Sequence, residues 1–110
     1  MRKKDEWFLF QEFVASHFDD IDPTSRSTKA SGGSTEKGDI KFQTVKLHIE
    51  CKDYTTKTAY NEDWMQKCID EVPFHSDKIP VLITRNKNGK IRAHMDFTDF
   101  VDMYKESIDE

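Results

Sequence analysis

The spacing of apolar residues changes along this chain, and that change restricts the fold more than any other feature. Over residues 4–18 the large apolar side chains recur every three or four positions, which is the period of a helix with one buried face. Over residues 45–52 the period is two, which is the period of a strand with one buried face. The apolar face of this strand is formed by Val45, Leu47, Ile49 and Cys51, and the opposite face by Lys46, His48, Glu50 and Lys52. Both periods in one chain indicate the α+β or α/β class.

The other segments extend this pattern. A short alternating segment at residues 38–42 predicts another strand. Asn61 is a typical helix cap, and we expect a second helix from there to Pro73. Strands are predicted at residues 79–85 and about 90–95, joined by a turn at Asn88-Gly89.

A last helix is predicted at about residues 97–108. Its apolar side chains are Phe97, Phe100, Val101, Tyr104 and Ile108. This stripe belongs to the core or to a dimer interface, which periodicity does not distinguish. The predicted order is αββαββα, a mixed sheet flanked by helices.

The length of 110 residues suits one domain, residues 1–110, in which residues 19–37 form a mobile loop rich in Ser and Gly. No apolar run approaches the roughly 20 residues that span a bilayer, so we expect no membrane segment. The basic N-terminus is followed by acids and by no cleavage site, so we expect no signal peptide. Cys51 and Cys68 are expected to be reduced and packed as small apolar residues. The expected compartment is the cytoplasm, that of the host if a phage encodes the chain.

The charge is unevenly distributed. The whole chain carries −4, but residues 24–57 hold seven cations and four anions, a net charge of +3. A basic middle in an acidic chain is compatible with a nucleic-acid partner without requiring one.

The predicted strands at 38–42 and 45–52 are close enough in sequence to form a hairpin. The register that matches apolar faces sets Ile40 opposite Ile49, and it sets Asp39 opposite Glu50 on the other face. Two acids about 5 Å apart destabilise a sheet unless a cation lies between them. The implied turn at Thr44-Val45 lacks Gly and Asn, so a longer connection or a register shifted by two stays open.

Carboxylates on one strand face suit a hard cation, and we expect Mg²⁺ or Mn²⁺ at Asp39 and Glu50. Lys52 follows Glu50 on the same face, about 7 Å along the strand. An ammonium group there can orient the attacking water and stabilise charge on a phosphoryl group. These residues together predict phosphodiester hydrolysis. The alternative interpretation is an exposed strand face with an ordinary mixture of charges.

The motif Gly38-Asp39, followed by Glu50-Cys51-Lys52 after an apolar strand, resembles the PD-(D/E)XK nuclease superfamily, with Gly38 in place of the proline. The segment from Arg26 to Gly32 is similar to the Ser- and Gly-rich stretch of archaeal and phage Holliday junction resolvases. The resemblance covers roughly residues 4–95, and its specific part is residues 26–52.

The resemblance implies a restriction-endonuclease-like core and a role for each matching residue. Asp39 and Glu50 would be metal ligands together with the backbone carbonyl of Cys51, and Lys52 the catalytic lysine. An acid of the first helix would join them, and we favour Glu6 over Glu12 because it lies nearer the apolar face. The residues expected to contact substrate are Arg26, Lys29, Ser31 and Gln66. Loop and surface positions without function are the alternative for these four, and for His48 we prefer a half-exposed strand histidine.

The function so predicted is a Mg²⁺-dependent DNA endonuclease of the junction-resolvase type, active in DNA recombination as a homodimer. A small domain gains from burying a two-fold interface, and resolvases cut two strands symmetrically. The alternatives are another nuclease of the superfamily (nicking, repair or restriction type) and an inactive nucleic-acid-binding module of the same fold. An unrelated α+β interaction protein would lack a metal at the acidic pair.

Overall fold

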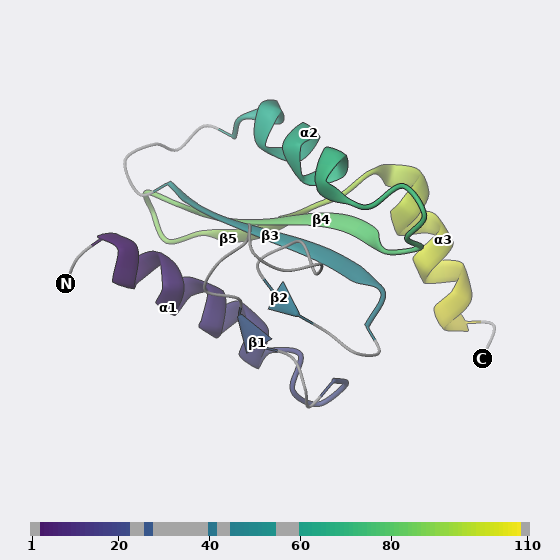
Figure 1. The fold of residues 1–110 in the computed structure, drawn as a ribbon, viewed down its shortest axis with the longest axis horizontal. Coiled ribbons are helices and arrows are strands. Elements are labelled where there is room, and N and C mark those ends of the chain that lie inside the picture. Colours follow the sequence, from purple (N-terminus) through teal and green to yellow (C-terminus); the bar gives the residue numbers. More distant parts are fainter. Residues whose placement is uncertain (1–2, 23–25, 28–39, 42–44, 55–59, 109–110) are drawn as a thin grey trace.

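The computed structural model describes residues 3–22, 26–27, 40–41, 45–54 and 60–108, and it places the side chains of residues 8–22, 40, 45–54 and 60–108. The elements are α1 (Lys3–Ser16), β1 (Arg26–Ser27), β2 (Ile40–Lys41), β3 (Leu47–Tyr54), α2 (Glu62–Glu71), β4 (Ile79–Asn86), β5 (Ile91–His94) and α3 (Phe97–Ile108). The class is α+β, as the sequence predicts, with a mixed sheet and helices on both of its faces (Figure 1).

The main sheet has three described strands in the order β3-β4-β5. Strands β3 and β4 run parallel, with Leu47 opposite Ile79 and Tyr54 opposite Asn86. Parallel neighbours need a long crossover connection, and α2 supplies it. Strand β5 returns antiparallel to β4, with Leu82 opposite His94. The fold therefore aligns three strands so that side chains at Glu50, Leu82 and His94 form one row on one face.

The two faces of β3 pack against different helices. On one face Ile49 and Cys51 join a buried cluster with Phe10 and Val14 of α1. On the other face, to which the even-numbered residues of β3 point, lies α2, whose buried residues are Met65 and Cys68. Figure 1 shows α1 and α2 on opposite sides of the sheet. The polar face of β3 is therefore covered by a helix rather than open to solvent.

The predicted hairpin between residues 38–42 and 45–52 is wrong for the part of β2 that the structure describes. Ile40 and Lys41 pair antiparallel with β1, with Ile40 opposite Ser27. The apolar match that suggested the hairpin is still present, because Ile40 and Ile49 lie in the same buried cluster. Burial in a common core constrains which faces meet, but it does not require the two strands to share hydrogen bonds.

Local sequence signals at the other elements are confirmed. The Asn61 side chain accepts a hydrogen bond from the Asp63 backbone N–H at 2.9 Å, which caps α2. Gly89 has a φ of 77°, the conformation that the turn between β4 and β5 requires. Cys51 and Cys68 are buried and are not joined in a disulfide. Among the described residues, no helix is long and apolar enough to cross a bilayer.

Candidate metal site

Three side chains that could hold a metal ion meet between β3 and α2. They are His48 and Glu50 of β3 and Glu71 at the end of α2. His48 Nε2 lies 3.6 Å from Glu50 Oε1 and 3.9 Å from Glu71 Oε2. The His48 side chain is 1% exposed, whereas those of Glu50 and Glu71 are 17% and 30% exposed. The cluster is therefore closed at the histidine and open toward the solvent at Glu71.

The secondary structure accounts for this convergence. His48 and Glu50 are two residues apart on a strand, so their side chains leave the same face. On α2, Glu71 follows Trp64 by seven residues and Cys68 by three, which places it on the helix face that meets the sheet. Cys68 Sγ lies 3.9 Å from the backbone oxygen of His48, so the two elements are in direct contact beside the cluster.

The spacing of the donor atoms fits a single ion. One nitrogen and two carboxylate oxygens all lie within 4.8 Å of one another. Donors about 2.1 Å from one octahedral ion lie roughly 3 Å apart when adjacent and roughly 4 Å apart when opposite. A small inward movement of the carboxylates would complete three bonds. Without an ion, a protonated His48 would form ion pairs with both acids.

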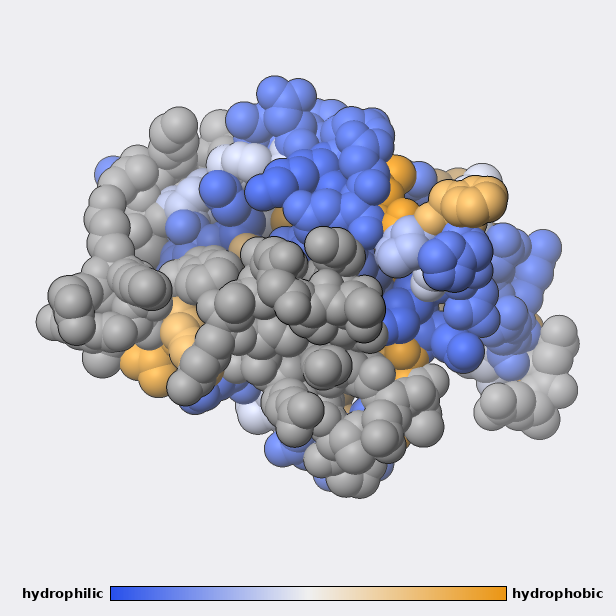
Figure 2. Space-filling model, in the orientation of Figure 1, coloured by the Kyte–Doolittle hydropathy of each residue, from blue (hydrophilic) through white to orange (hydrophobic). Residues whose placement is uncertain are grey.

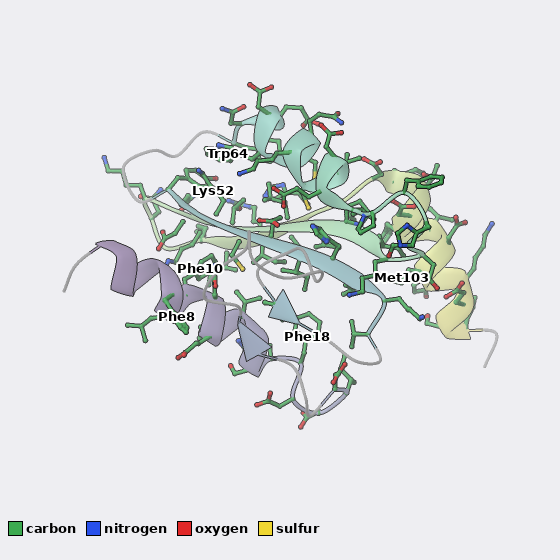
Figure 3. The ribbon with its side chains drawn as sticks, in the orientation of Figure 1. Phe8, Phe10, Phe18, Lys52, Trp64 and Met103 are labelled. Carbon is green, nitrogen blue, oxygen red and sulfur yellow. The ribbon has the colours of Figure 1, made fainter. Side chains whose placement is uncertain are left out.

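Lys52 extends the same face of β3 toward the first turn of α2. Its ammonium nitrogen lies 5.3 Å from the centre of the Trp64 ring, a cation–π contact. Trp64 in turn packs against Tyr54, with ring centroids 4.6 Å apart. Figure 3 shows Lys52 and Trp64 together on the α2 side of the sheet. The lysine is exposed but oriented, since an aromatic ring fixes the direction of its side chain.

Of the residues expected in the site, the structure brings only Glu50 into the cluster and places Lys52 on the same face. Asp39, Lys29 and Ser31 lie outside the described residues. Glu12 is exposed on α1, which covers the opposite face of β3, and the structure does not bring it to Glu50.

The remaining expected residues lie elsewhere in the fold. Glu6 also belongs to α1, Arg26 belongs to β1, and Cys51 lies between Glu50 and Lys52 in β3. Gln66 is exposed on α2, and its amide donates a hydrogen bond to Asp70 at 2.9 Å. That contact within the helix accounts for Gln66 without a substrate.

Two residues of the cluster were not predicted as ligands. His48 was interpreted as half-exposed, which is wrong, because α2 covers it and leaves 2% of the residue exposed. Glu71 was not selected, although its spacing from Trp64 and Cys68 continues the helix stripe to the end of α2. An acid on an apolar stripe could have indicated that Glu71 belongs to a site, because a buried carboxylate needs a partner.

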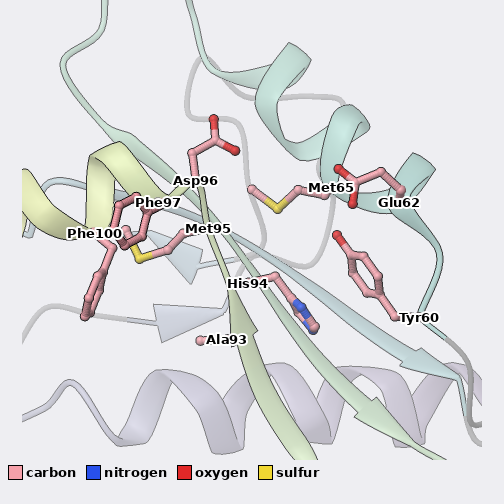
Figure 4. Close-up of a pocket in the computed structure, with 9 residues that line it drawn as sticks. All are labelled: Tyr60, Glu62, Met65, Ala93, His94, Met95, Asp96, Phe97 and Phe100. Atoms are coloured by element: carbon pink, nitrogen blue, oxygen red, sulfur yellow. The ribbon is translucent and has the colours of Figure 1, made fainter.

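A second group of polar side chains lines a cavity of about 480 Å³ on the same side of the sheet, between α2, β5 and the start of α3 (Figure 4). His94 stacks on Tyr60 with ring centroids 4.3 Å apart, and its Nε2 hydrogen-bonds to Thr84 Oγ1 at 2.9 Å. Burial, followed by the charge of Arg92, lowers the pKa of His94. Burial and a hydrogen bond to Glu62 raise the pKa of Tyr60 to about 12.

The lowered pKa of His94 predicts a loss of stability in mild acid. Below the ordinary histidine pKa of about 6.5 the unfolded chain binds a proton that the folded chain resists, so the free energy of unfolding falls as pH drops through that value. His94→Gln, which can still hydrogen-bond to Thr84, should lose less over the same decrease in pH, measured by urea titration. The same substitution at exposed His75 is the control. An equal pH dependence in wild type and His94→Gln would contradict the prediction.

Comparison of the chain with protein-family models, with curated proteins and with solved structures found no match. The cluster and Lys52 together offer one imidazole, two carboxylates and one oriented ammonium group. That donor set is suited to binding a divalent ion beside an anionic group.

Proposed function

We propose that this protein is a metal-dependent DNA endonuclease that hydrolyses phosphodiester bonds, with Mg²⁺ or Mn²⁺ at His48, Glu50 and Glu71. The observation that carries the proposal is the convergence of these three donors, with an oriented lysine two residues beyond Glu50 on the same strand. The resemblance of residues 26–52 to the PD-(D/E)XK superfamily supports the same chemistry. A restriction-endonuclease-like core and a role for Asp39 as a further ligand belong to this proposal.

A divalent ion at the cluster would polarise a phosphate and lower the pKa of a bound water. Glu50 and Glu71 supply the negative charge that holds the ion, and His48 supplies a neutral nitrogen. Imidazole is a better ligand for transition ions than for Mg²⁺, so the described donors favour Mn²⁺. In this proposal Glu71 is the additional acidic residue of the metal site, a role that the resemblance implied for an acid of the first helix.

Lys52 is the residue that we expect to act on substrate directly. Its ammonium group would stabilise charge that develops on the phosphoryl oxygens, and Trp64 would hold it in position. Lys46 and Lys67 add exposed cations on either side of the cluster, although each already forms an ion pair, with Asp77 and Glu71. Figure 2 shows mainly hydrophilic side chains over α2 beside this site. DNA binding there should be weak and strongly salt-dependent.

Burial of His48 favours a second candidate function. Because the imidazole is almost completely buried, the cluster could instead hold α2 against β3, through a bound ion or through ion pairs. It would then take no part in catalysis. The protein would then be a nucleic-acid-binding module or an interaction protein whose metal is structural.

Cleavage assays discriminate between these functions. A labelled four-way DNA junction and a linear duplex of the same sequence are incubated with the protein and Mn²⁺ or Mg²⁺, and with a chelator as the blank. Metal-dependent cuts in the junction alone support the resolvase type, and cuts in both substrates support a nicking, repair or restriction type. Binding without cleavage under all conditions would refute the nuclease proposal and favour the structural site.

Lys52→Ala provides a further prediction. Because the ammonium group would act mainly in the transition state, the cleavage rate should fall by about a hundredfold or more while DNA affinity changes by only a few fold. Lys87→Ala removes an exposed cation from the turn between β4 and β5, outside the metal cluster, and serves as the matched control. A loss confined to affinity would reduce Lys52 to a phosphate contact.

A further inference from the structure

Helix α3 is amphipathic, yet it buries none of its side chains. None of its twelve residues, all of which the structure describes, is buried. Phe97 is 77% exposed, Tyr104 is 60% exposed and Ile108 is 64% exposed. Phe100 and Met103 are also exposed apolar residues of this helix. Such a continuous apolar surface on a helix is typical of a contact with another protein surface.

The stripe has a symmetry that suits a second copy of this chain. Phe97 and Ile108 lie at equal distances from a midpoint between residues 102 and 103, and so do Val101 and Tyr104. If two α3 helices met antiparallel about that midpoint, Phe97 would lie beside the partner's Ile108, and Val101 beside the partner's Tyr104. Apolar residues would therefore meet at both ends and near the centre of the contact, and Phe100 would lie beside the aliphatic part of the partner's Lys105.

The helix dipoles favour the antiparallel direction. In an antiparallel pair the positive end of each helix dipole lies beside the negative end of the other, whereas a parallel pair would place like ends together. Asp102 is two residues from Tyr104, which places it on nearly the opposite side of the helix, away from the contact.

The cavity described above lies at one end of this surface. Phe97 and Phe100 line it from α3, together with Met95 (Figure 4). The antiparallel register carries the partner's Ile108 to Phe97, so a second copy would cover the apolar rim of the cavity. An aromatic side chain offers roughly 150–250 Å², so two such stripes would bury roughly 1,000 Å² in total, near the lower limit for specific association.

We infer that α3 is the surface through which two copies of this chain associate, as a symmetric pair with the α3 helices antiparallel. The interface is small, so association is weak and depends on concentration. It does not rest on the proposed nuclease function, because no residue of the metal cluster takes part.

Sedimentation velocity over low to high micromolar protein concentrations tests the inference. The wild-type chain should shift from monomer to dimer, and Ile108→Glu or Tyr104→Glu should weaken association at least about tenfold by placing unpaired charges in the interface. Because these side chains are exposed in the monomer, the Mn²⁺ affinity should stay unchanged, as should the melting temperature measured at low protein concentration, where the wild type is monomeric. A wild-type chain that remains monomeric throughout would overturn the inference.

Two control variants test the surface itself. Phe74→Glu changes a fully exposed aromatic residue outside α3, and Ile91→Glu changes an exposed residue of β5; neither should affect association. Loss of the dimer in Ile91→Glu but not in Ile108→Glu would place the contact at the edge of the sheet and overturn the assignment to α3.

Discussion

Glu50→Gln is expected to reduce metal-dependent DNA cleavage by at least about a thousandfold, because the substitution removes the charge from one of the two carboxylate ligands of the cluster. The amide keeps nearly the same size, so β3 and its packing should be retained. Removing one of two neighbouring acids also lowers their mutual repulsion, so the free energy of unfolding should stay equal or rise slightly. The rate is measured on a labelled junction or a supercoiled plasmid with Mn²⁺, and stability by urea titration.

Glu12→Gln is the matched control for this variant. It makes the same change in charge on α1, across the sheet from the cluster, and should leave the cleavage rate and Mn²⁺ binding unchanged. Full activity of Glu50→Gln would refute the metal assignment. If Glu12→Gln were the inactive variant instead, the site would lie on the α1 side of the sheet.

Much of the fold could be predicted from the sequence because local chemistry determines it. The cap at Asn61, the proline after α2 and the glycine at residue 89 each require a particular backbone conformation within a few residues. The pairing of β2 could not be predicted in the same way. Ile40 buries its side chain in the common core without having to pair with β3. The strand partner that the structure describes for β3 is β4, which lies far along the chain. Apolar matching alone did not select the partner strand.

The candidate metal site was predicted only in part, because contacts between distant elements again could not be read from local sequence. The alternation of β3 correctly placed Glu50 and Lys52 on one face, and it also placed His48 there. What alternation does not specify is which element covers that face. Because α2 crosses over it, a residue near the end of that helix, Glu71, becomes a neighbour of Glu50, and His48 is buried. Such a contact joins positions more than 20 residues apart and follows only from the topology.

The final helix illustrates the same limit. Its stripe was predicted correctly in extent, from Phe97 to Ile108, but an apolar face is equally consistent with burial within the chain and with burial between chains. The exposure of Phe97 and Tyr104 excludes the core as their location.

The largest expected effect on stability is that of Phe10→Ala. Phe10 has no exposed surface and packs in the cluster that joins α1 to β3. The guanidinium carbon of Arg85 also lies 4.5 Å from the centre of its ring, while Arg85 forms an ion pair with the buried Asp53. Truncation leaves a cavity and removes this contact, so the free energy of unfolding should fall by about 3–5 kcal/mol.

Phe13→Ala is the control on the same helix, since 48% of that residue is exposed and it should cost about 1 kcal/mol or less. Both variants are compared by urea titration with a common slope. Small domains are stable by only about 5–15 kcal/mol, so the loss expected for Phe10→Ala should be seen as a clear shift of the urea midpoint to lower concentration. The molecules that stay folded should keep the Mn²⁺ affinity of the wild type, because Phe10 lies across the sheet from His48 and Glu50. Equal losses of stability in the two variants would mean that α1 does not pack on β3 through Phe10, and the division of β3 into a core face and a metal-binding face would then be wrong.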